Sequence, residues 1–267
     1  MPTNSSANGA RAILCRSRRW SCWLVLALLA LYGSPVAALN LRLAVASNLA
    51  GVAPKLVAEF NQQRRLAGEP EVTIDLSFAA TGVLFAQIVN GAPFDLFLSA
   101  DREPVAELVG RGRARPEDRV EFATGILVLY SRDRVVNAES LKPGDFQHLA
   151  LANPATAPFG RAAVQVLTNL KLYEGLKSRL VLGNSIAQTF EFVRSGNAEL
   201  GFVALSTLHD GRESSGNFWL IPPELYSPLP QTAVILARSG RAELARGFLR
   251  FLVSPAAQGL LLKNGYG

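Results

Sequence analysis

Short apolar runs and amphipathic stretches alternate along the chain after position 38. Unbroken apolar runs, or apolar residues at every second position, predict strands at 41–45, 72–78, 95–99, 125–130, 149–152, 179–182, 200–205, 218–221 and 231–237. Apolar residues spaced three or four positions apart predict helices at 53–64, 83–89, 104–109, 160–170, 186–194, 242–252 and 255–262. Because strands and helices alternate, the pattern predicts an α/β fold with parallel-rich sheets flanked by helices.

The same pattern indicates how the chain is divided. No low-complexity linker separates two halves, which favours two lobes joined by two crossover strands. The best candidates for these crossings are 120–124 and 227–231, where Pro228 and Pro230 stiffen the return. We therefore expect residues 39–122 and 231–267 to form a discontinuous first lobe and residues 123–230 to form the second.

Residues 1–38 have the pattern of an export signal. Four arginines come first, an apolar run fills 23–32, and Val36-Ala37-Ala38 offers small residues to a peptidase. A membrane span needs about 20 apolar residues, and this run is shorter. The segment therefore predicts a cleavable signal peptide and an exported protein.

The composition of the chain without residues 1–38 excludes several classes of function. The formal charge of +6 misleads, because four of the 27 basic residues and none of the 21 acidic residues lie in the leader. The rest of the chain is nearly balanced and has no cluster of Lys or Arg, so we expect no nucleic-acid partner. Both cysteines, Cys15 and Cys22, also lie in the leader. With only His148 and His209 as histidines, we expect no metal site, no cofactor and no catalytic thiolate.

The residues that could bind a ligand lie where predicted strands lead into predicted helices. Four such segments, 47–48, 81–82, 157–160 and 183–186, carry small, hydroxyl or amide residues. In open α/β sheets ligands bind beyond the carboxyl ends of the strands, where helix starts present free N–H groups that favour anions. Taken singly, however, each Ser, Asn or Thr is an ordinary helix cap worth about 1 kcal/mol. Spacing alone leaves a small-anion site and a set of caps as open alternatives.

Several longer motifs carry a family resemblance. The stretch Gly-Ala-Pro-Phe-Asp-Leu-Phe-Leu-Ser-Ala-Asp at 91–101 is the most specific of them, and the others lie at 44–49, 77–82, 153–160 and 192–204. On these motifs the chain resembles, from Leu41 to its C-terminus, the periplasmic molybdate-binding proteins of ABC importers. The resemblance implies a two-lobed periplasmic-binding-protein fold of the type II kind, which closes on a tetrahedral oxyanion. It also implies a periplasmic monomer that binds molybdate or tungstate, hands it to an ABC permease and is not an enzyme.

The resemblance also assigns site residues by position. Ser47 and Asn48 would offer side-chain and N–H donors, Thr81 would do so from the second helix start, and Phe159 and Ile186 would offer backbone N–H groups. Neutral donors suit a fully deprotonated dianion, whose oxygens only accept hydrogen bonds. Two positions depart from the family pattern, because Phe159 and Ala204 stand where some members carry Tyr.

Other functions stay open beside this reading. A binder of another tetrahedral oxyanion, such as sulfate, would use the same kind of site. A secreted enzyme acting on oxyanion esters would need a nucleophile with a base beside it, and Ser47 has no evident partner. We interpret Arg161 as a solvated surface residue or a residue that steers anions toward the cleft. Asp95 and Asp101 lie at the two ends of one strand, too far apart to act as a catalytic pair. We interpret Asp101 as a loop or cap residue and Asp95 as structural.

Overall fold

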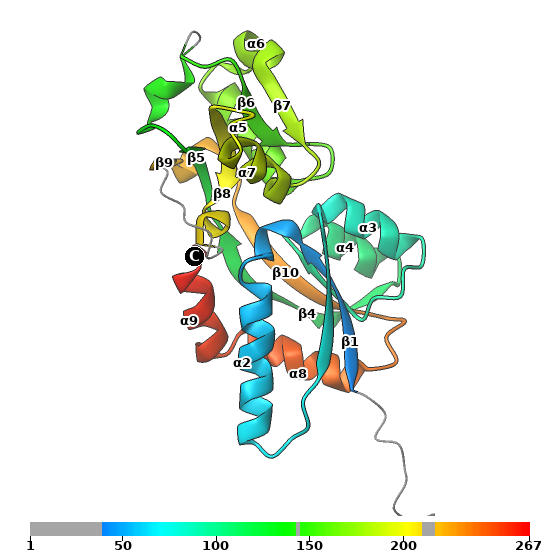
Figure 1. Cartoon of the computed structure of the whole chain (residues 1–267). Helices are drawn as coiled ribbons and strands as arrows, with labels where there is room; N and C mark the ends of the chain where they lie inside the picture. Colours follow the sequence, from blue (N-terminus) through cyan, green and yellow to red (C-terminus); the bar gives the residue numbers. More distant parts are fainter. Residues whose placement is uncertain (1–38, 143–144, 210–216) are drawn as a thin grey trace, which may run out of the picture. The chain divides into compact units, whose positions relative to one another are not determined.

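The computed structural model describes residues 39–142, 145–209 and 217–267 (Figure 1). These residues belong to one compact unit, Leu39–Gly267. The predicted leader, with both cysteines, lies outside the described residues. Within the described ranges, no helix combines the length and the apolar character needed to cross a bilayer.

The first sheet holds five strands in the order β2-β1-β3-β10-β4. Its strands are β1 (Asn40–Ala46), β2 (Thr73–Ala79), β3 (Leu96–Ser99), β4 (Ala114–Gly125) and β10 (Leu229–Leu236). β1 pairs in parallel with β2 and β3, whereas β10 runs antiparallel to both β3 and β4. The parallel strands therefore bring the ends of β1, β2 and β3 to one edge of the sheet.

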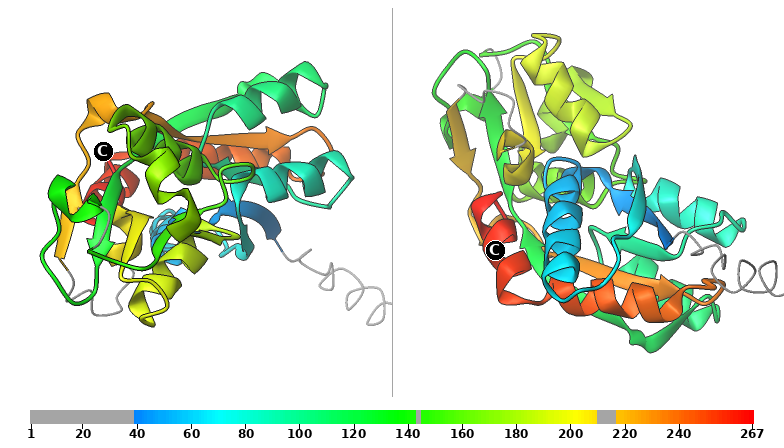
Figure 2. Two further views of the ribbon diagram at one scale, coloured as in Figure 1. Left: turned by 90° about the horizontal axis from the view of Figure 1, so that it is seen from above. Right: turned by 60° about the horizontal axis from the view of Figure 1, so that its bottom comes forward.

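Helices cover both faces of this sheet. On one face, α3 (Thr81–Val89) and α4 (Glu103–Gly110) pack on a cluster that contains Phe97 and Val234. On the other lie α2 (Ala53–Leu66), α8 (Ala242–Leu252) and α9 (Pro255–Lys263), and Figure 2 shows these C-terminal helices beside α2. Phe60 of α2 meets Phe248 of α8 edge to face, with ring centroids 5.2 Å apart. Burial of these aromatic rings fixes the C-terminal helices on the first sheet.

The second sheet has the order β7-β6-β8-β5-β9. Its strands are β5 (Leu127–Ser131), β6 (Leu149–Ala152), β7 (Leu180–Gly183), β8 (Leu200–Ala204) and β9 (Asn217–Leu220). Its helices are α5 (Pro158–Asn169), α6 (Tyr173–Leu176) and α7 (Ile186–Arg194). The described residues also contain the 3-10 turns η1 (Ser47–Leu49), η2 (Ala138–Leu141), η3 (Lys177–Arg179), η4 (Leu205–His209) and η5 (Pro223–Leu225). β6 pairs in parallel with β7 and β8, and β5 runs antiparallel to β8 and β9.

The chain passes between the sheets twice. β4 ends at Gly125 in the first sheet and β5 begins at Leu127 in the second, while β10 returns to the first sheet at Leu229, opposite Gly125. The expected α/β fold with two crossover strands is confirmed, and the antiparallel pairs arise because these crossing strands run against the parallel ones. The lobe boundaries 39–122, 123–230 and 231–267 stay a prediction.

One strand was longer than the sequence suggested. β4 extends back to Ala114, although only 120–124 was expected to be extended. Its early residues include Arg115, Glu117 and Arg119, which are exposed on this edge strand. An edge strand with a solvated face lacks the apolar run on which the prediction depended.

Candidate functional site

The four predicted segments lie at the carboxyl ends of parallel strands. η1 follows β1, α3 follows β2, α5 follows β6 and α7 follows β7. The five predicted site residues are all buried, none more than 5 % exposed: Ser47, Asn48, Thr81, Phe159 and Ile186. Phe159 and Ile186 also belong to the apolar core cluster, so only their backbone groups are suited to polar contacts. The sequence therefore delivers polar groups to a protected edge rather than to open solvent.

Three of these helical starts lack a side-chain cap. The residues at the cap position are Ala46, Ala80 and Ala157, and none of them accepts a hydrogen bond through its side chain. Only the fourth start has a cap, because Ser185 accepts a hydrogen bond from Gln188 N at 3.3 Å. Alanine is a poor residue for a cap, since it cannot satisfy the first N–H groups of the helix. The interpretation of Ser47, Asn48 and Thr81 as ordinary caps is therefore wrong.

Hydrogen bonds bring starts from different sheets together. Gly82 N, in the first turn of α3, donates to Thr156 O in the loop before α5 at 2.8 Å. Ser206 Oγ, in η4 of the second sheet, donates to Asn48 O at 3.0 Å. η1 also packs against α7. A pocket of about 390 Å³ lies at this contact, lined by Ser47, Asn48, Ala50, Gly51, Ala187, Gln188, Phe190, Glu191 and Thr207. Of the five predicted site residues, this pocket includes Ser47 and Asn48, whereas Thr81, Phe159 and Ile186 are not among its lining residues.

Phe159 approaches the crossover strands closely. A Cβ atom added at Gly125 would lie 2.7 Å from Phe159 Cζ and 2.9 Å from Gln231 Nε2. Only glycine fits between these two groups, because real Cβ atoms do not approach other atoms so closely. The start of α5 is therefore in contact with the point where the chain crosses between the sheets.

The hydroxyl groups of the first sheet are arranged as donors. Thr81 Oγ1 accepts a hydrogen bond from Ala100 N at 3.2 Å, which leaves its own proton free to donate elsewhere. Ser47 Oγ lines the 390 Å³ pocket and bonds no other side chain among the described residues. Both hydroxyls suit a ligand that only accepts hydrogen bonds.

The side chain of Asn48 does not have the free donor that the sequence led us to expect. Its Nδ2 donates to Gln231 Oε1 at 2.8 Å and to Tyr266 OH at 3.1 Å, so the protein itself engages the side-chain amide. The backbone N–H of Asn48 is then the donor that this residue has left for a ligand. Sequence reasoning missed both Gln231 and Tyr266. The one available signal was Gln231, a polar residue within the apolar strand β10.

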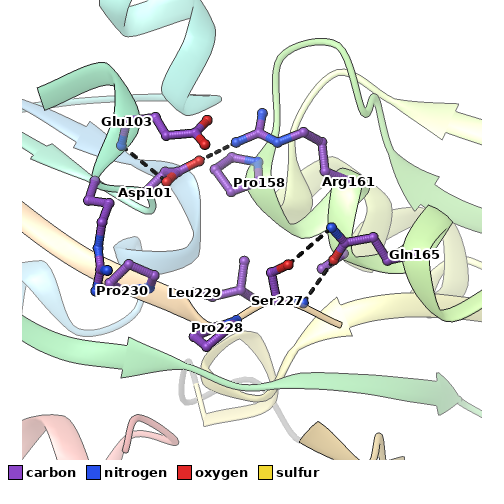
Figure 3. Close-up of a pocket in the computed structure, with 11 residues that line it drawn as sticks. Asp101, Glu103, Pro158, Arg161, Gln165, Ser227, Pro228, Leu229 and Pro230 are labelled. Atoms are coloured by element: carbon purple, nitrogen blue, oxygen red, sulfur yellow. Dashed lines mark hydrogen bonds and ion pairs between the residues drawn. The ribbon is translucent and has the colours of Figure 1, made fainter. Parts of the chain in front are cut away.

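Charged groups lie at the edge of this region (Figure 3). Arg161 of α5 forms an ion pair with Asp101, which follows β3 in the first sheet, and both line a pocket of about 320 Å³. Asp101 Oδ1 also accepts from Glu103 N at 3.2 Å at the start of α4. Neither interpretation of Arg161 anticipated this pair between the two sheets, although the Arg161 side chain is still 42% exposed. The interpretation of Asp101 as a loop or cap residue is confirmed.

The remaining candidate groups have structural partners. Asp95 accepts hydrogen bonds from Arg42 N at 2.9 Å and from Ser239 Oγ at 2.7 Å, as its structural reading requires. Ala204, at the buried end of β8, brings no hydroxyl to the site. Burial raises the pKa of Tyr266, which stays a neutral phenol. In the described part of the chain, no group of three or more His, Cys, Asp or Glu residues could hold a metal ion.

Known proteins share this architecture. A family model described as a bacterial extracellular solute-binding protein matches residues 41–267. The chain is 41% identical to the molybdate-binding protein ModA of Azotobacter vinelandii, over 86% of this chain and 90% of that protein. It is 38% identical to ModA of Rhodobacter capsulatus, over 87% of this chain and 90% of that protein.

Solved structures agree with these relatives. The periplasmic molybdate-binding protein of Azotobacter vinelandii matches with a TM-score of 0.78 at 34% identity, covering 85% of this chain and 98% of that one. The sulfate-binding protein SubI of Mycobacterium tuberculosis matches with a TM-score of 0.69 at 14% identity, covering 85% of this chain and 86% of that one. The second match is a likeness of fold alone.

Proposed function

The chain belongs to the ModA family of bacterial extracellular solute-binding proteins, and from that premise we propose that it captures molybdate for an ABC importer. The observation that carries the proposal is the set of buried helical starts whose cap positions hold alanine. Their N–H groups have no side-chain acceptor of their own, and two neutral hydroxyls lie among them. Such a site favours a small anion with acceptor oxygens on every side.

We assign five donors to the ligand. They are the hydroxyls of Ser47 and Thr81 and the backbone N–H groups of Asn48, Phe159 and Ile186. A hydrogen bond to a charged group contributes about 1.5–3 kcal/mol, so five of them support tight binding after the cost of association is subtracted. The five assigned donors are all neutral, so none of them places a buried carboxylate against a dianion.

Selectivity among oxyanions follows from size and protonation. Tungstate has nearly the size and charge of molybdate and is expected to bind as well. Sulfate is smaller, so a rigid pocket leaves its oxygens poorly matched to the donors. Phosphate retains a proton near neutral pH, and that proton would find no acceptor among the five donors.

Transport requires the lobes to close on the anion. We propose that residues 39–122 and 231–267 move against residues 123–230 about the crossings near Gly125 and Leu229. The predicted leader would export the protein to the periplasm, where a monomer would hand the anion to an inner-membrane permease. Binding without turnover is the expected activity, in line with relatives that are binding proteins.

Calorimetric titration of the purified exported protein with molybdate, tungstate, sulfate and phosphate tests this function. We expect tight binding of the first two and much weaker binding of the others. Sulfate binding as tightly as molybdate would favour the alternative oxyanion binder. Sustained hydrolysis of aryl sulfate or phosphate esters would favour the secreted enzyme instead.

A further inference from the structure

Asn48 lies at the centre of a buried network that reaches beyond the anion site. Its Nδ2 donates to Gln231 Oε1 and to Tyr266 OH, at 2.8 and 3.1 Å. Its carbonyl oxygen accepts from Tyr266 OH at 2.8 Å and from Ser206 Oγ at 3.0 Å. All four residues are at most 5 % exposed, so these bonds form away from competing water.

The bonds fix the orientation of both amides. Gln231 Nε2 donates to Leu229 O at 2.9 Å, and a carbonyl oxygen can only accept. Gln231 therefore turns its oxygen toward Asn48, which must in turn present its nitrogen. Tyr266 OH has a single proton and gives it to Asn48 O, so it accepts from Asn48 Nδ2. Each hydrogen bond in this network therefore determines which partner donates in the next one.

The partners of Asn48 come from the segments that cross between the sheets. Gln231 lies on β10, two residues after the strand begins at Leu229. Beside Tyr266, Gly267 exchanges two backbone hydrogen bonds with Thr124 near the end of β4, at 2.7 and 2.9 Å. Tyr266 itself forms a β-bridge with Gly125. The turn at Asn48 is thus tied to both crossover strands and, through Ser206, to the second sheet.

We propose that Gln231 and Tyr266 are positioning residues, which hold the Asn48 turn in its binding conformation and couple it to the crossover strands. The inference rests on the proposed function, because the bound anion is its readout. Neither side chain contacts the anion in this proposal. Both act through Asn48, and the loss of either lets the donor at residue 48 move away from its place in the site.

A double-mutant cycle tests the action of Gln231 through Asn48. Gln231→Met keeps the side-chain length but removes the acceptor for Asn48 Nδ2, and we expect molybdate affinity to fall about ten-fold. Asn48→Ala removes the group that Gln231 holds. The Asn48→Ala/Gln231→Met double variant should then bind molybdate no more weakly than Asn48→Ala alone. Losses that add would mean that Gln231 acts by general packing, and would overturn the proposal.

Tyr266→Phe provides the second arm of the test. It removes one hydroxyl from a buried ring, and we expect about a ten-fold loss of molybdate affinity. The matched control is Tyr226→Phe, because Tyr226 OH also lies near a crossing, where it accepts from Leu127 N at 3.3 Å, and it is not hydrogen-bonded to Asn48. The control should bind molybdate as the unaltered protein does. Thermal unfolding without ligand confirms that each variant is folded.

The outcomes separate the two claims. Failure of the unaltered protein to bind molybdate would overturn the proposed function and this inference with it. Tight binding by the unaltered protein, together with unchanged binding by Tyr266→Phe and Gln231→Met, would overturn only the positioning role. Equal losses in Tyr266→Phe and Tyr226→Phe would also overturn it, because the effect would then follow from any hydroxyl near the crossings.

Discussion

Two kinds of contact join the sheets, hydrogen bonds between neutral groups and an ion pair between charged ones. The neutral contacts are Ser206 Oγ to Asn48 O at 3.0 Å, which is buried, and Gly82 N to Thr156 O at 2.8 Å, which is partly exposed. The charged contact is the ion pair of Arg161 with Asp101, whose side chains are 42% and 15% exposed. The donors proposed for the anion are thus neutral, whereas the charged pair is partly in contact with water.

This difference follows from the cost of burying charge. A buried carboxylate would repel a dianion, and a buried arginine paired to it would lose solvation that the pair does not fully restore. Neutral N–H and O–H groups avoid both costs and still bind a charged ligand strongly. The partly exposed ion pair is screened by water and salt, so we expect it to contribute little to closure. Four sets of substitutions test this division.

The largest effect is expected from charge placed inside the neutral region. Asn48→Asp puts a carboxylate against Gln231 Oε1 and beside the proposed dianion. An uncompensated buried charge costs about 3–5 kcal/mol, so molybdate affinity should fall more than 100-fold. Titration calorimetry measures the loss, with Asn197→Asp on the exposed surface as the control for net charge. Near-normal affinity in Asn48→Asp would show that residue 48 lies outside the anion site.

A smaller effect is expected when a neutral donor is removed. Ser47→Ala or Thr81→Ala each deletes one proposed hydroxyl donor and should weaken molybdate binding by about 1–3 kcal/mol. Thr81→Ser retains the hydroxyl and should restore most of the affinity. Thr73→Ala, at an exposed position on β2, controls for the loss of a threonine. If Thr81→Ser binds as weakly as Thr81→Ala, the threonine acts through its methyl group and not as a donor.

The sequence predicted the elements well because apolar periodicity records burial directly. Most strands and helices were placed within a few residues. The exceptions were β4, whose exposed edge has no apolar run, and the short helix α6, which was not predicted. The four helical starts were also found, because each follows a predicted strand. Hydroxyl residues before helices are equally consistent with ordinary helix caps. The ligand was therefore suggested by the family resemblance and not by these residues alone. What decided against caps was Ala46, Ala80 and Ala157 at the true cap positions.

Contacts between segments far apart in the chain could not be predicted from the sequence. Tyr266 reaches Asn48 across 218 positions, and Arg161 reaches Asp101 across 60. Such pairs are set by the way in which the second sheet is inserted between β4 and β10, which no local pattern reports. A lone tyrosine near the C-terminus and an arginine in a first helical turn each fit a surface position equally well. Their roles became visible only when the crossings had been placed.

A third test asks whether the hydrogen bond of Gly82 N with Thr156 O forms on closure. A Cβ at Gly82 would lie 3.0 Å from Thr156 O, so Gly82→Ala crowds the contact between α3 and the loop before α5. We expect molybdate affinity to fall by about 1 kcal/mol through overpacking. Without ligand, the same change should leave stability equal or slightly raised, because alanine favours a helix over glycine. Gly259→Ala is the matched control, since nothing lies within 4 Å of its added Cβ. Equal affinity in Gly82→Ala and Gly259→Ala would mean that this contact does not limit closure.

The smallest effect is expected at the ion pair of Arg161 with Asp101, which is partly exposed. Asp101→Asn removes the charge but keeps an oxygen that can accept from Glu103 N at the start of α4. A surface ion pair contributes about 0.2–1 kcal/mol, and Arg161 in this pair is 42% exposed, so molybdate affinity should fall less than about five-fold at low salt. The loss should disappear near 1 M salt, where the screening length is about 3 Å. Glu121→Gln is the control, because it breaks the exposed pair with Arg102 within the first sheet and should leave affinity unchanged. A loss in Asp101→Asn that persists at high salt would mean that this pair acts like the neutral contacts, and that the division between neutral and charged contacts is wrong.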